Sequence, residues 1–376
     1  MNSPRTVLAF MFLSVAGLPA QTTVEAGTAL LAERYTFDAG LAYSAVTEFS
    51  LPVTVSAALS RRAALTVSGG LTRVSLTGVS GGPADQDLTG LVDTEARLVM
   101  AVVPDRLSLL LTAVLPTGTE ALEVEESSIL TALSSQVIGF STTSLGSGGR
   151  AGVGMVGTIP AGDMALGIAG SYTHSMSYGP VVGQPGQWKP GGQLRLRAGM
   201  EGAVGVRTYL RLSSIVLIRQ EDQVDGLDLG QTGTQVHGYV SLNHGLAAGS
   251  LTLYAMDSFR SAPQIEATAV GSALLPRGNL LALGGRLELP VARGARLVPR
   301  IEVRRLSEAS RDPTRGDRLE AAGTTLRVGA DLRMPVSPDF AVVVEGNGLF
   351  GNVGDGVGGT VGVRGFRLGL HLAVRR

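Results

Sequence analysis

Residues 193–200 read Gln-Leu-Arg-Leu-Arg-Ala-Gly-Met, in which apolar side chains alternate with charged or small ones at every second position. Because successive side chains of a β-strand point to opposite faces, Leu194 and Leu196 share one face, and Arg195 and Arg197 share the other. One face suits contact with lipid and the other suits contact with water. The stretch therefore predicts a strand that separates an apolar environment from a polar one.

The same alternation returns in the segments around residues 207–218, 297–304, 326–334 and 366–374. In each segment Leu, Val or Ile dominates one face, and polar or charged side chains and Gly dominate the other. A soluble β-sandwich would pack its apolar faces into one core rich in large aromatic side chains, whereas only 5% of this chain is aromatic. Small and evenly spread apolar faces are typical of the wall of a barrel.

Hydrophobic residues make up 44% of the chain, yet after residue 20 no stretch approaches the ~20 consecutive apolar residues that a membrane helix needs. Every backbone N–H and C=O must be paired in lipid, which leaves a closed barrel as the alternative to helices. We therefore predict an all-β, transmembrane, antiparallel up-and-down β-barrel in a bacterial outer membrane. Its expected surroundings are outer-membrane lipid and lipopolysaccharide.

Turn signals alternate in length along the chain, as short turns and long loops do at the two rims of such a barrel. The short set comprises Arg61-Arg62, Pro104–Arg106, Ala161–Asp163, Glu201–Ala203, Ala247–Gly249, Ala292–Gly294 and Ser337–Asp339. Longer polar or Gly/Pro-rich connections fall between them. The count predicts about sixteen strands, the first near Tyr35–Ser44, or about fourteen if residues 35–49 form a luminal plug or a bent arm.

The first twenty residues have the three parts of a secretory signal. Arg5 is followed by the apolar run Thr6–Gly17 and then by Leu18-Pro19-Ala20, which predicts export and cleavage after Ala20. The expected organisation is a signal peptide at residues 1–20, an N-terminal periplasmic or luminal segment at 21–34, and the barrel at 35–376.

The polar members of the alternating segments form the set that we expect to line the interior. They are Asp93, Glu95, Arg97, Arg195, Arg197, Arg207, Tyr209, Arg211, Arg286, Glu288, Arg300, Glu302, Arg304, Arg327, Asp331, Arg333, Glu345, Arg367 and His371. Two interpretations stay open. The charges can pair with one another, because isolated charges in the interior would be costly, or rings of charge can select the solutes that pass.

One long connection differs from the others, because residues 121–140 lack alternation. Leu122, Ile129, Leu133 and Val137 recur near helical spacing, which predicts a short amphipathic helix in an outer loop. The helix could fold over or into the barrel as a packing element or lid. Alternatively, its apolar face could gather a hydrophobic ligand at the pore mouth.

The region from Asp87 to Thr119 carries a family resemblance. It passes from Leu-Thr-Gly-Leu-Val-Asp at 88–93 through an alternating hairpin to Leu-Pro-Thr-Gly at 115–118. This arrangement resembles the outer-membrane transporters related to the long-chain fatty-acid porin and to the meta-pathway phenol-degradation proteins. The resemblance implies a monomeric barrel that admits hydrophobic or aromatic small molecules. Val92 departs from the pattern, and the N-terminal hatch motif of the fatty-acid porins has no counterpart.

The residue types that carry catalysis or bind metals do not cluster in the sequence. His174, His237, His244 and His371 are scattered, with no His-Glu-x-x-His spacing for zinc, and the chain has no Cys. His174-Ser175 lacks the Gly-x-Ser-x-Gly elbow of hydrolases. We therefore expect no cofactor, no metal and no enzymatic activity.

The chain has 31 basic and 31 acidic residues, and this balance gives no indication of a nucleic-acid partner. The leading hypothesis is an outer-membrane channel or transporter for passive uptake of small-molecule solutes, with hydrophobic or aromatic ones implied by the resemblance. The alternatives are a structural or adhesive surface barrel with an ion-paired closed lumen and, behind it, a barrel-embedded hydrolase.

Overall fold

A computed structural model of the chain describes residues 23–79, 84–123, 126–183, 186–265, 276–292, 294–309, 318–356 and 358–375. Its barrel strands are β1 (Val24–Phe37), β2 (Tyr43–Ser60), β3 (Ala63–Gly78), β4 (Gln86–Val103), β5 (Leu107–Leu115), β6 (Arg150–Ala161), β7 (Met164–Ser175), β9 (Gln193–Gly205), β10 (Thr208–Arg219), β13 (Gln235–Leu246), β14 (Gly249–Arg260), β16 (Gly278–Pro290), β17 (Arg296–Ala309), β18 (Leu319–Ser337), β19 (Phe340–Gly354) and β20 (Thr360–Arg375). The signal peptide expected at residues 1–20 lies outside the described residues.

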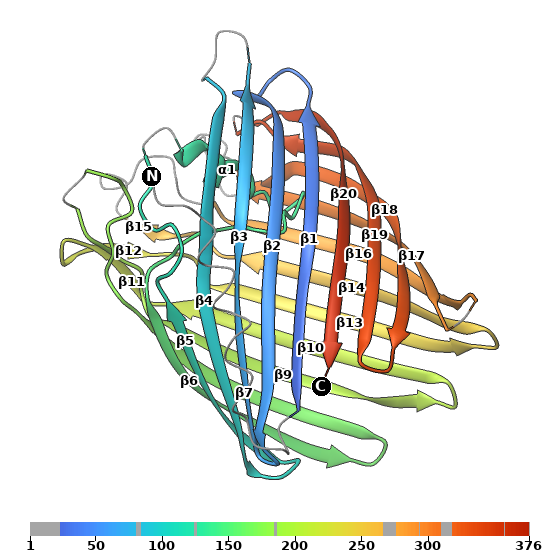
Figure 1. Ribbon diagram of the computed structural model, residues 1–376. Helices are drawn as coiled ribbons and strands as arrows, with labels where there is room; N and C mark the ends of the chain where they lie inside the picture. Colours follow the sequence, from blue (N-terminus) through green and yellow to red (C-terminus); the bar gives the residue numbers. More distant parts are fainter. Residues whose placement is uncertain are drawn as a thin grey trace.

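The described strands close into a barrel of sixteen, each antiparallel to its neighbours (Figure 1). The seam is the pairing of β1 with β20, which runs from Glu25 opposite Arg375 to Phe37 opposite Val363. The other edge of β1 pairs with β2. The prediction of an all-β barrel with sixteen strands, rather than fourteen, is therefore confirmed.

The first strand begins earlier than the sequence indicated. β1 starts at Val24, so most of the segment expected to be a periplasmic or luminal arm at 21–34 is part of the wall. Residues 38–42, which we expected to be strand, form the connection to β2. The cause is a mixed pattern in β1: Leu30 is exposed on the outer face, while Leu31, Tyr35 and Phe37 are buried on the inner face.

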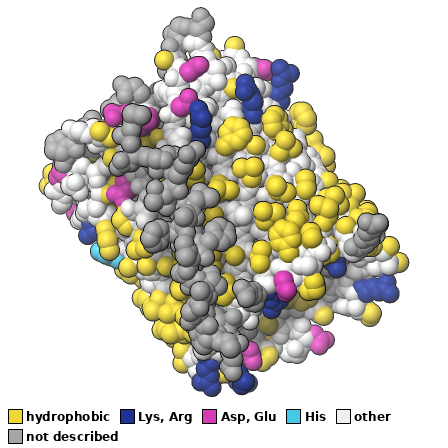
Figure 2. All heavy atoms as spheres, viewed as in Figure 1, with side chains coloured by type: hydrophobic (Ala, Val, Ile, Leu, Met, Phe, Trp, Pro, Cys, Tyr) yellow, Lys and Arg dark blue, Asp and Glu magenta, His cyan; other side chains and the backbone are white. Residues whose placement is uncertain are grey.

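The two faces of the wall differ as the alternation predicts. Leu30, Ile168 and Leu368 are exposed on the outer face, at 57%, 64% and 53%. Figure 2 shows hydrophobic side chains spread over the wall, with Lys and Arg gathered toward its two ends. Among the described residues, no helix is long and apolar enough to cross a membrane.

The short and long connections fall on opposite rims, which we call the short-turn rim and the long-loop rim. The short turn expected at Glu201–Ala203 is wrong, because β9 continues to Gly205 and the chain turns at Val206-Arg207. Gly202 is instead a point of close approach, where a Cβ would collide with the backbone oxygen of Asp163. A glycine that resembled a turn signal is required by packing between strands.

Four further strands form a separate sheet in the order β15-β12-β11-β8, which we call the collar. They are β8 (Trp188–Lys189), β11 (Glu221–Val224), β12 (Leu227–Gln231) and β15 (Gln264–Ile265). All four belong to long connections, and Figure 1 shows β11, β12 and β15 at the long-loop end of the wall. Asp225 and Gly226, with φ of 51° and 80°, make the two-residue turn between β11 and β12. We predicted only a long connection here, although Asp-Gly is a preferred sequence for such a turn.

The packing of Gly202 generates a prediction. Gly202→Ala should destabilise the barrel by about 1–3 kcal/mol, because the added methyl group meets backbone rather than a flexible side chain. Gly238→Ala is the matched control, because nothing lies within 4 Å of a Cβ built there. The stability of each variant is measured as the urea midpoint of unfolding in detergent, with the gel mobility of unheated samples as the readout. Equal midpoints for the two variants would contradict the register.

Candidate functional site

The connection from Pro116 to Gly149, which we call the inner loop, folds back onto the inner face of the barrel. Its helix α1 (Ser127–Leu133) confirms the predicted short helix, although Leu122 and Val137 lie outside it. All four predicted apolar residues, Leu122, Ile129, Leu133 and Val137, belong to one buried cluster with side chains of β1, β3 and β19. The apolar face of the helix is therefore used for packing against the wall.

Four consecutive backbone carbonyls attach the inner loop to the wall. The carbonyls of Gln136, Val137, Ile138 and Gly139 accept hydrogen bonds from Arg304 Nη1 (3.2 Å), Thr325 Oγ1 (2.9 Å), Arg327 Nη2 (2.6 Å) and Arg367 Nη2 (2.8 Å). Three of the four donors are charged, and hydrogen bonds from charged donors are about twice as strong as neutral ones. Three arginines predicted to line the interior therefore hold a loop in place.

Gly139 is required where the loop passes closest to the wall. Its φ of +67° is a conformation that L side chains rarely adopt, and a Cβ there would collide with Arg304 Nη1. The absence of a side chain lets the Arg304 guanidinium reach the carbonyl of Gln136.

A buried carboxylate, Glu33 on β1, joins the wall to the loop. It accepts hydrogen bonds from Arg367 Nε and Nη2 (3.0 and 2.8 Å), Tyr35 Oη (2.8 Å) and the Ser141 N–H (2.8 Å). The Tyr35 ring packs edge-on against Phe140, with the centroids 5.1 Å apart. Glu33 is 1% exposed, so its charge depends on these donors.

A second carboxylate, Glu48, lies directly opposite Glu33 on the inner face of β2. It is fully buried, and the hydroxyl and backbone N–H of Thr142 in the inner loop are the hydrogen-bond donors beside it. The neighbouring inner-face hydroxyl of Ser50 is buried and has no hydrogen-bond partner among the described residues. Like charges directly opposite on two strands repel one another, so a charged Glu48 would strain the wall behind the inner loop.

The two ends of the loop are attached through Asp93 on β4. Its carboxylate accepts hydrogen bonds from the backbone N–H groups of Gly118 (3.0 Å) and Ser147 (2.8 Å) and from Ser147 Oγ (3.0 Å). Between these ends, Thr142 Oγ1 lies 3.0 Å from Thr72 Oγ1 of β3. The inner loop thus follows the inner face from β17 through β1 to β4.

Most predicted interior residues on β16–β20 pair with one another. The contacts are Arg300 with Glu345 (3.0 Å) and Asp331 (3.4 Å), Arg304 with Glu302 (2.7 Å), His371 with Glu345 (3.2 Å), and Arg333 with Glu288 and Asp331 (3.9 Å each). Tyr254 Oη also donates to Glu302 at 2.7 Å. On this side, ion pairing accounts for most of the charges.

A second group of interior arginines makes no ion pair, and its members are spread around the barrel. Arg195 and Arg197 on β9, Arg286 on β16 and Arg97 on β4 make no ion pair within 4 Å to any described residue, and all four are exposed. Cross-strand partners place Arg195 and Arg197 on the face opposite to the lipid-facing Leu194 and Leu196. An inner-face side chain is exposed only where no other segment packs on it, so the described residues leave these four arginines open to solvent.

The remaining predicted residues lie toward the short-turn rim or beside this wall. Arg211 is paired with Glu201 at 2.7 Å, and Tyr209 is exposed on the same face. Arg207 lies in the turn after β9, and Glu95 is exposed beside Arg97 on β4. Sequence reasoning missed Glu33 and Glu48, because their strands alternate apolar side chains with acidic ones on an inner face that was expected to be wholly polar.

The whole chain was compared with known proteins. No protein-family model matches the chain, and no curated protein matches it. Among solved structures it is similar to Acinetobacter baumannii OccAB3, with 10% identity over 95% of this chain and 100% of that one, at a TM-score of 0.51. The outer membrane protein OprD from Pseudomonas aeruginosa (10% identity, 96% of each chain, TM-score 0.49) and an outer membrane channel from Pseudomonas putida F1 (12%, 96% and 97%, TM-score 0.37) are more distant.

At these identities the similarity shows the fold alone. The chain has the closed, sixteen-stranded, antiparallel barrel fold of the porins. The finer resemblance to fatty-acid and phenol-degradation transporters is not confirmed and stays a prediction.

The attachment of the loop generates a second prediction. Arg367→Gln leaves Glu33 buried without its charged partner, which costs about 3–5 kcal/mol in comparable sites. Amide hydrogen exchange of residues 136–141 should therefore be faster by more than tenfold. Arg364→Gln is the control, because Arg364 lies on the same strand but is exposed on the outer face. Unchanged exchange in Arg367→Gln would show that the wall does not hold the loop.

Proposed function

We propose that the protein is an outer-membrane channel for passive passage of small solutes, and that it favours solutes carrying negative charge. The observation that carries the proposal is the set of exposed, unpaired arginines on the inner face: Arg97, Arg195, Arg197 and Arg286. All four are exposed, so the inner loop does not cover them.

Charge on the wall of a narrow aqueous passage selects ions by raising the local concentration of the opposite charge. A guanidinium stays charged at any pH that the protein would meet, and its planar donors match a carboxylate bidentately. On β9, Arg195 and Arg197 are two residues apart, so their side chains project on the same face about 7 Å from one another. A carboxylate could pass from one to the next.

The apolar side chains of the interior argue against a passage lined with hydrocarbon. The buried cluster of Tyr35, Val74, Leu349 and their neighbours is covered by the inner loop and is not available to a solute. The family resemblance implies hydrophobic or aromatic solutes, and the exposed arginines favour negative charge. Molecules that combine an aromatic ring with a carboxylate have both properties. Aromatic carboxylates are the solute class that fits both features.

The proposed location follows from the outer surface. Its exposed Leu, Val and Ile side chains would contact outer-membrane lipid, and the long-loop rim would meet lipopolysaccharide. Export through a cleaved signal peptide remains part of the proposal. No nucleic-acid partner and no cofactor are needed for passive passage.

A second candidate, a structural or adhesive surface barrel, is favoured by the collar, which offers a folded surface beyond the wall. The hydrolase alternative gains no such support, because His174 lies on the outer face of β7, away from the interior. Conduction separates the first two candidates, since an adhesive barrel does not require it.

The experiment is reconstitution in planar bilayers. The wild type should conduct and should prefer anions, as shown by the reversal potential in a salt gradient. Arg195→Gln combined with Arg197→Gln should lower the ratio of anion to cation permeability by at least twofold, because two fixed positive charges leave the passage.

Arg305→Gln combined with Arg364→Gln is the matched control, since both arginines are exposed on the outer face. This variant should keep the wild-type permeability ratio. A refolded protein that does not conduct would overturn the channel proposal. A protein that conducts without ion preference would overturn only the role of the arginines.

A further inference from the structure

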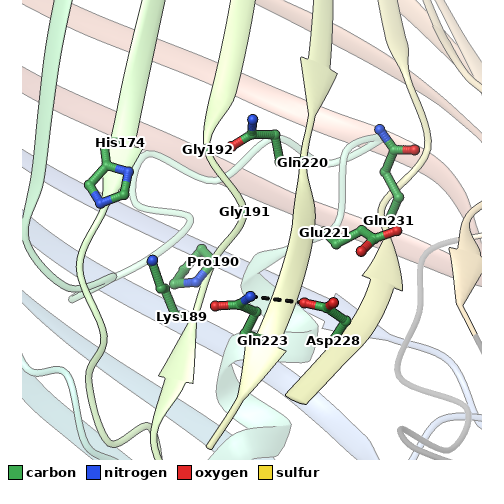
Figure 3. Close-up of a pocket in the computed structure, with 10 residues that line it drawn as sticks. All are labelled: His174, Lys189, Pro190, Gly191, Gly192, Gln220, Glu221, Gln223, Asp228 and Gln231. Atoms are coloured by element: carbon green, nitrogen blue, oxygen red, sulfur yellow. Dashed lines mark hydrogen bonds between the residues drawn. The ribbon is translucent and has the colours of Figure 1, made fainter. Parts of the chain in front are cut away.

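A polar hollow lies on the outside of the barrel, where the wall meets the collar (Figure 3). Its volume is about 420 Å³, which is within the range of small-molecule sites. His174 lies on the outer face of β7, after the exposed Ile168. Gln220 directly follows β10, in line with the exposed Ile218 on its outer face. The hollow therefore begins where the apolar outer face ends on β7 and β10, the two strands that flank β9, and it lies outside the barrel.

The collar contributes the side of the hollow that is drawn lower in Figure 3. Lys189 of β8 lies directly opposite Gln223 of β11, which lies opposite Asp228 of β12, so the three side chains share one face of the collar. Glu221 and Gln231 form the next row of the same face. Figure 3 shows these side chains gathered around one space, with the bond from Gln223 Nε2 to Asp228 Oδ1 (2.8 Å) on its lower side.

Two adjacent glycines form the floor. A Cβ at Gly192 would collide with Tyr172 Oη and lie 2.6 Å from Gln220 Oε1, and one at Gly191 would collide with the backbone of Gln220. Because both side chains are absent, Tyr172 Oη can donate to Gln220 Oε1 at 2.9 Å. This bond fixes the Gln220 carboxamide and leaves its NH₂ group to donate elsewhere. The Gly191 N–H is held by Asp222, which orders the segment.

The chemistry of the lining is that of a saccharide site. Carboxamides and carboxylates accept hydrogen bonds from hydroxyl groups, while the Lys189 ammonium and the Gln NH₂ groups donate to hydroxyl and ring oxygens. Among the described residues no carboxylate lies within 4 Å of the Lys189 amino group, and no hydrogen bond engages the Glu221 side chain. One Lys against Glu221 and Asp228 gives no excess of positive charge, which disfavours an isolated phosphate.

We propose that the hollow binds a sugar residue of the glycolipid that forms the outer leaflet around the barrel. This inference rests on the proposed location in an outer membrane. The occupant follows from position, because the hollow opens outward at the level where lipid-facing side chains give way to polar ones. A sugar bound there is beside the membrane rather than on the path through the barrel. The site would anchor the collar to its lipid neighbours.

The only Trp in the chain reports on this site. Trp188 precedes Lys189 in β8 and packs against Tyr178 with ring centroids 5.6 Å apart. Purified protein in detergent is titrated with lipopolysaccharide truncated to the inner-core sugars, and Trp emission is followed. Lipid A without core sugars and inorganic phosphate are titrated in parallel. Saturable change should occur with the core-bearing lipid and should be at least tenfold weaker with the other two.

Gln223→Ala combined with Asp228→Ala should weaken the response to the core-bearing lipid by at least tenfold. Gln220→Ala, which removes one carboxamide, should weaken it less and tests the site if the double variant fails to fold. Gln187→Ala is the control, because this residue directly precedes β8 but does not line the hollow. Equal responses to lipid A and to the core-bearing lipid, or equal binding by control and double variant, would overturn the inference.

Conductance of the same variants separates this inference from the channel proposal. Gln223→Ala with Asp228→Ala should conduct as the wild type does, because neither residue faces the passage. If the wild type conducts but does not bind the sugar, the proposal of a sugar site is wrong and the channel proposal stands. If the wild type binds the sugar but does not conduct, the channel proposal is wrong and the sugar site stands.

Discussion

The structure depends on the closure of one sheet. In a bilayer each unpaired backbone N–H or C=O costs several kcal/mol, so a sheet with a free edge cannot face lipid. The pairing of β1 with β20 removes both edges at once, along the whole length of β1. Closure also gives the side chains on the two faces of the sheet two different environments. The outer face meets hydrocarbon, and the inner face must satisfy its own charges.

The interior meets that demand in two different ways. On the β17–β4 side, arginines donate to the carbonyls of the inner loop and to Glu33, and an apolar cluster fills the space behind the loop. On the β9 side no segment among the described residues covers Arg195 and Arg197, and water is left to solvate them. The interior charges thus have a structural role beside the inner loop, and the selective role that we propose belongs to other places on the same wall.

Period-two alternation predicted the barrel and its strand number, because most of the wall separates lipid from water or from charge. It failed at β1, where Leu31, Tyr35 and Phe37 face inward and are buried. The rule assumed a polar interior, whereas these side chains pack against the inner loop, whose position no local pattern encodes. The turn at Glu201–Ala203 was mispredicted because Gly202 serves a contact with Asp163, which is distant in sequence. Glu33 and Glu48 were invisible for a similar reason, since their surroundings come from a loop about a hundred residues away.

The central claim is that the inner loop lies against one side of the interior and leaves a passage on the other. A chain without Cys allows a direct measurement, because Thr72→Cys with Thr142→Cys places two thiols where hydroxyl groups are 3.0 Å apart. The oxidised double variant should form the disulfide and keep the single-channel conductance of its reduced form. Failure to cross-link, or a conductance that falls when the disulfide forms, would contradict the account.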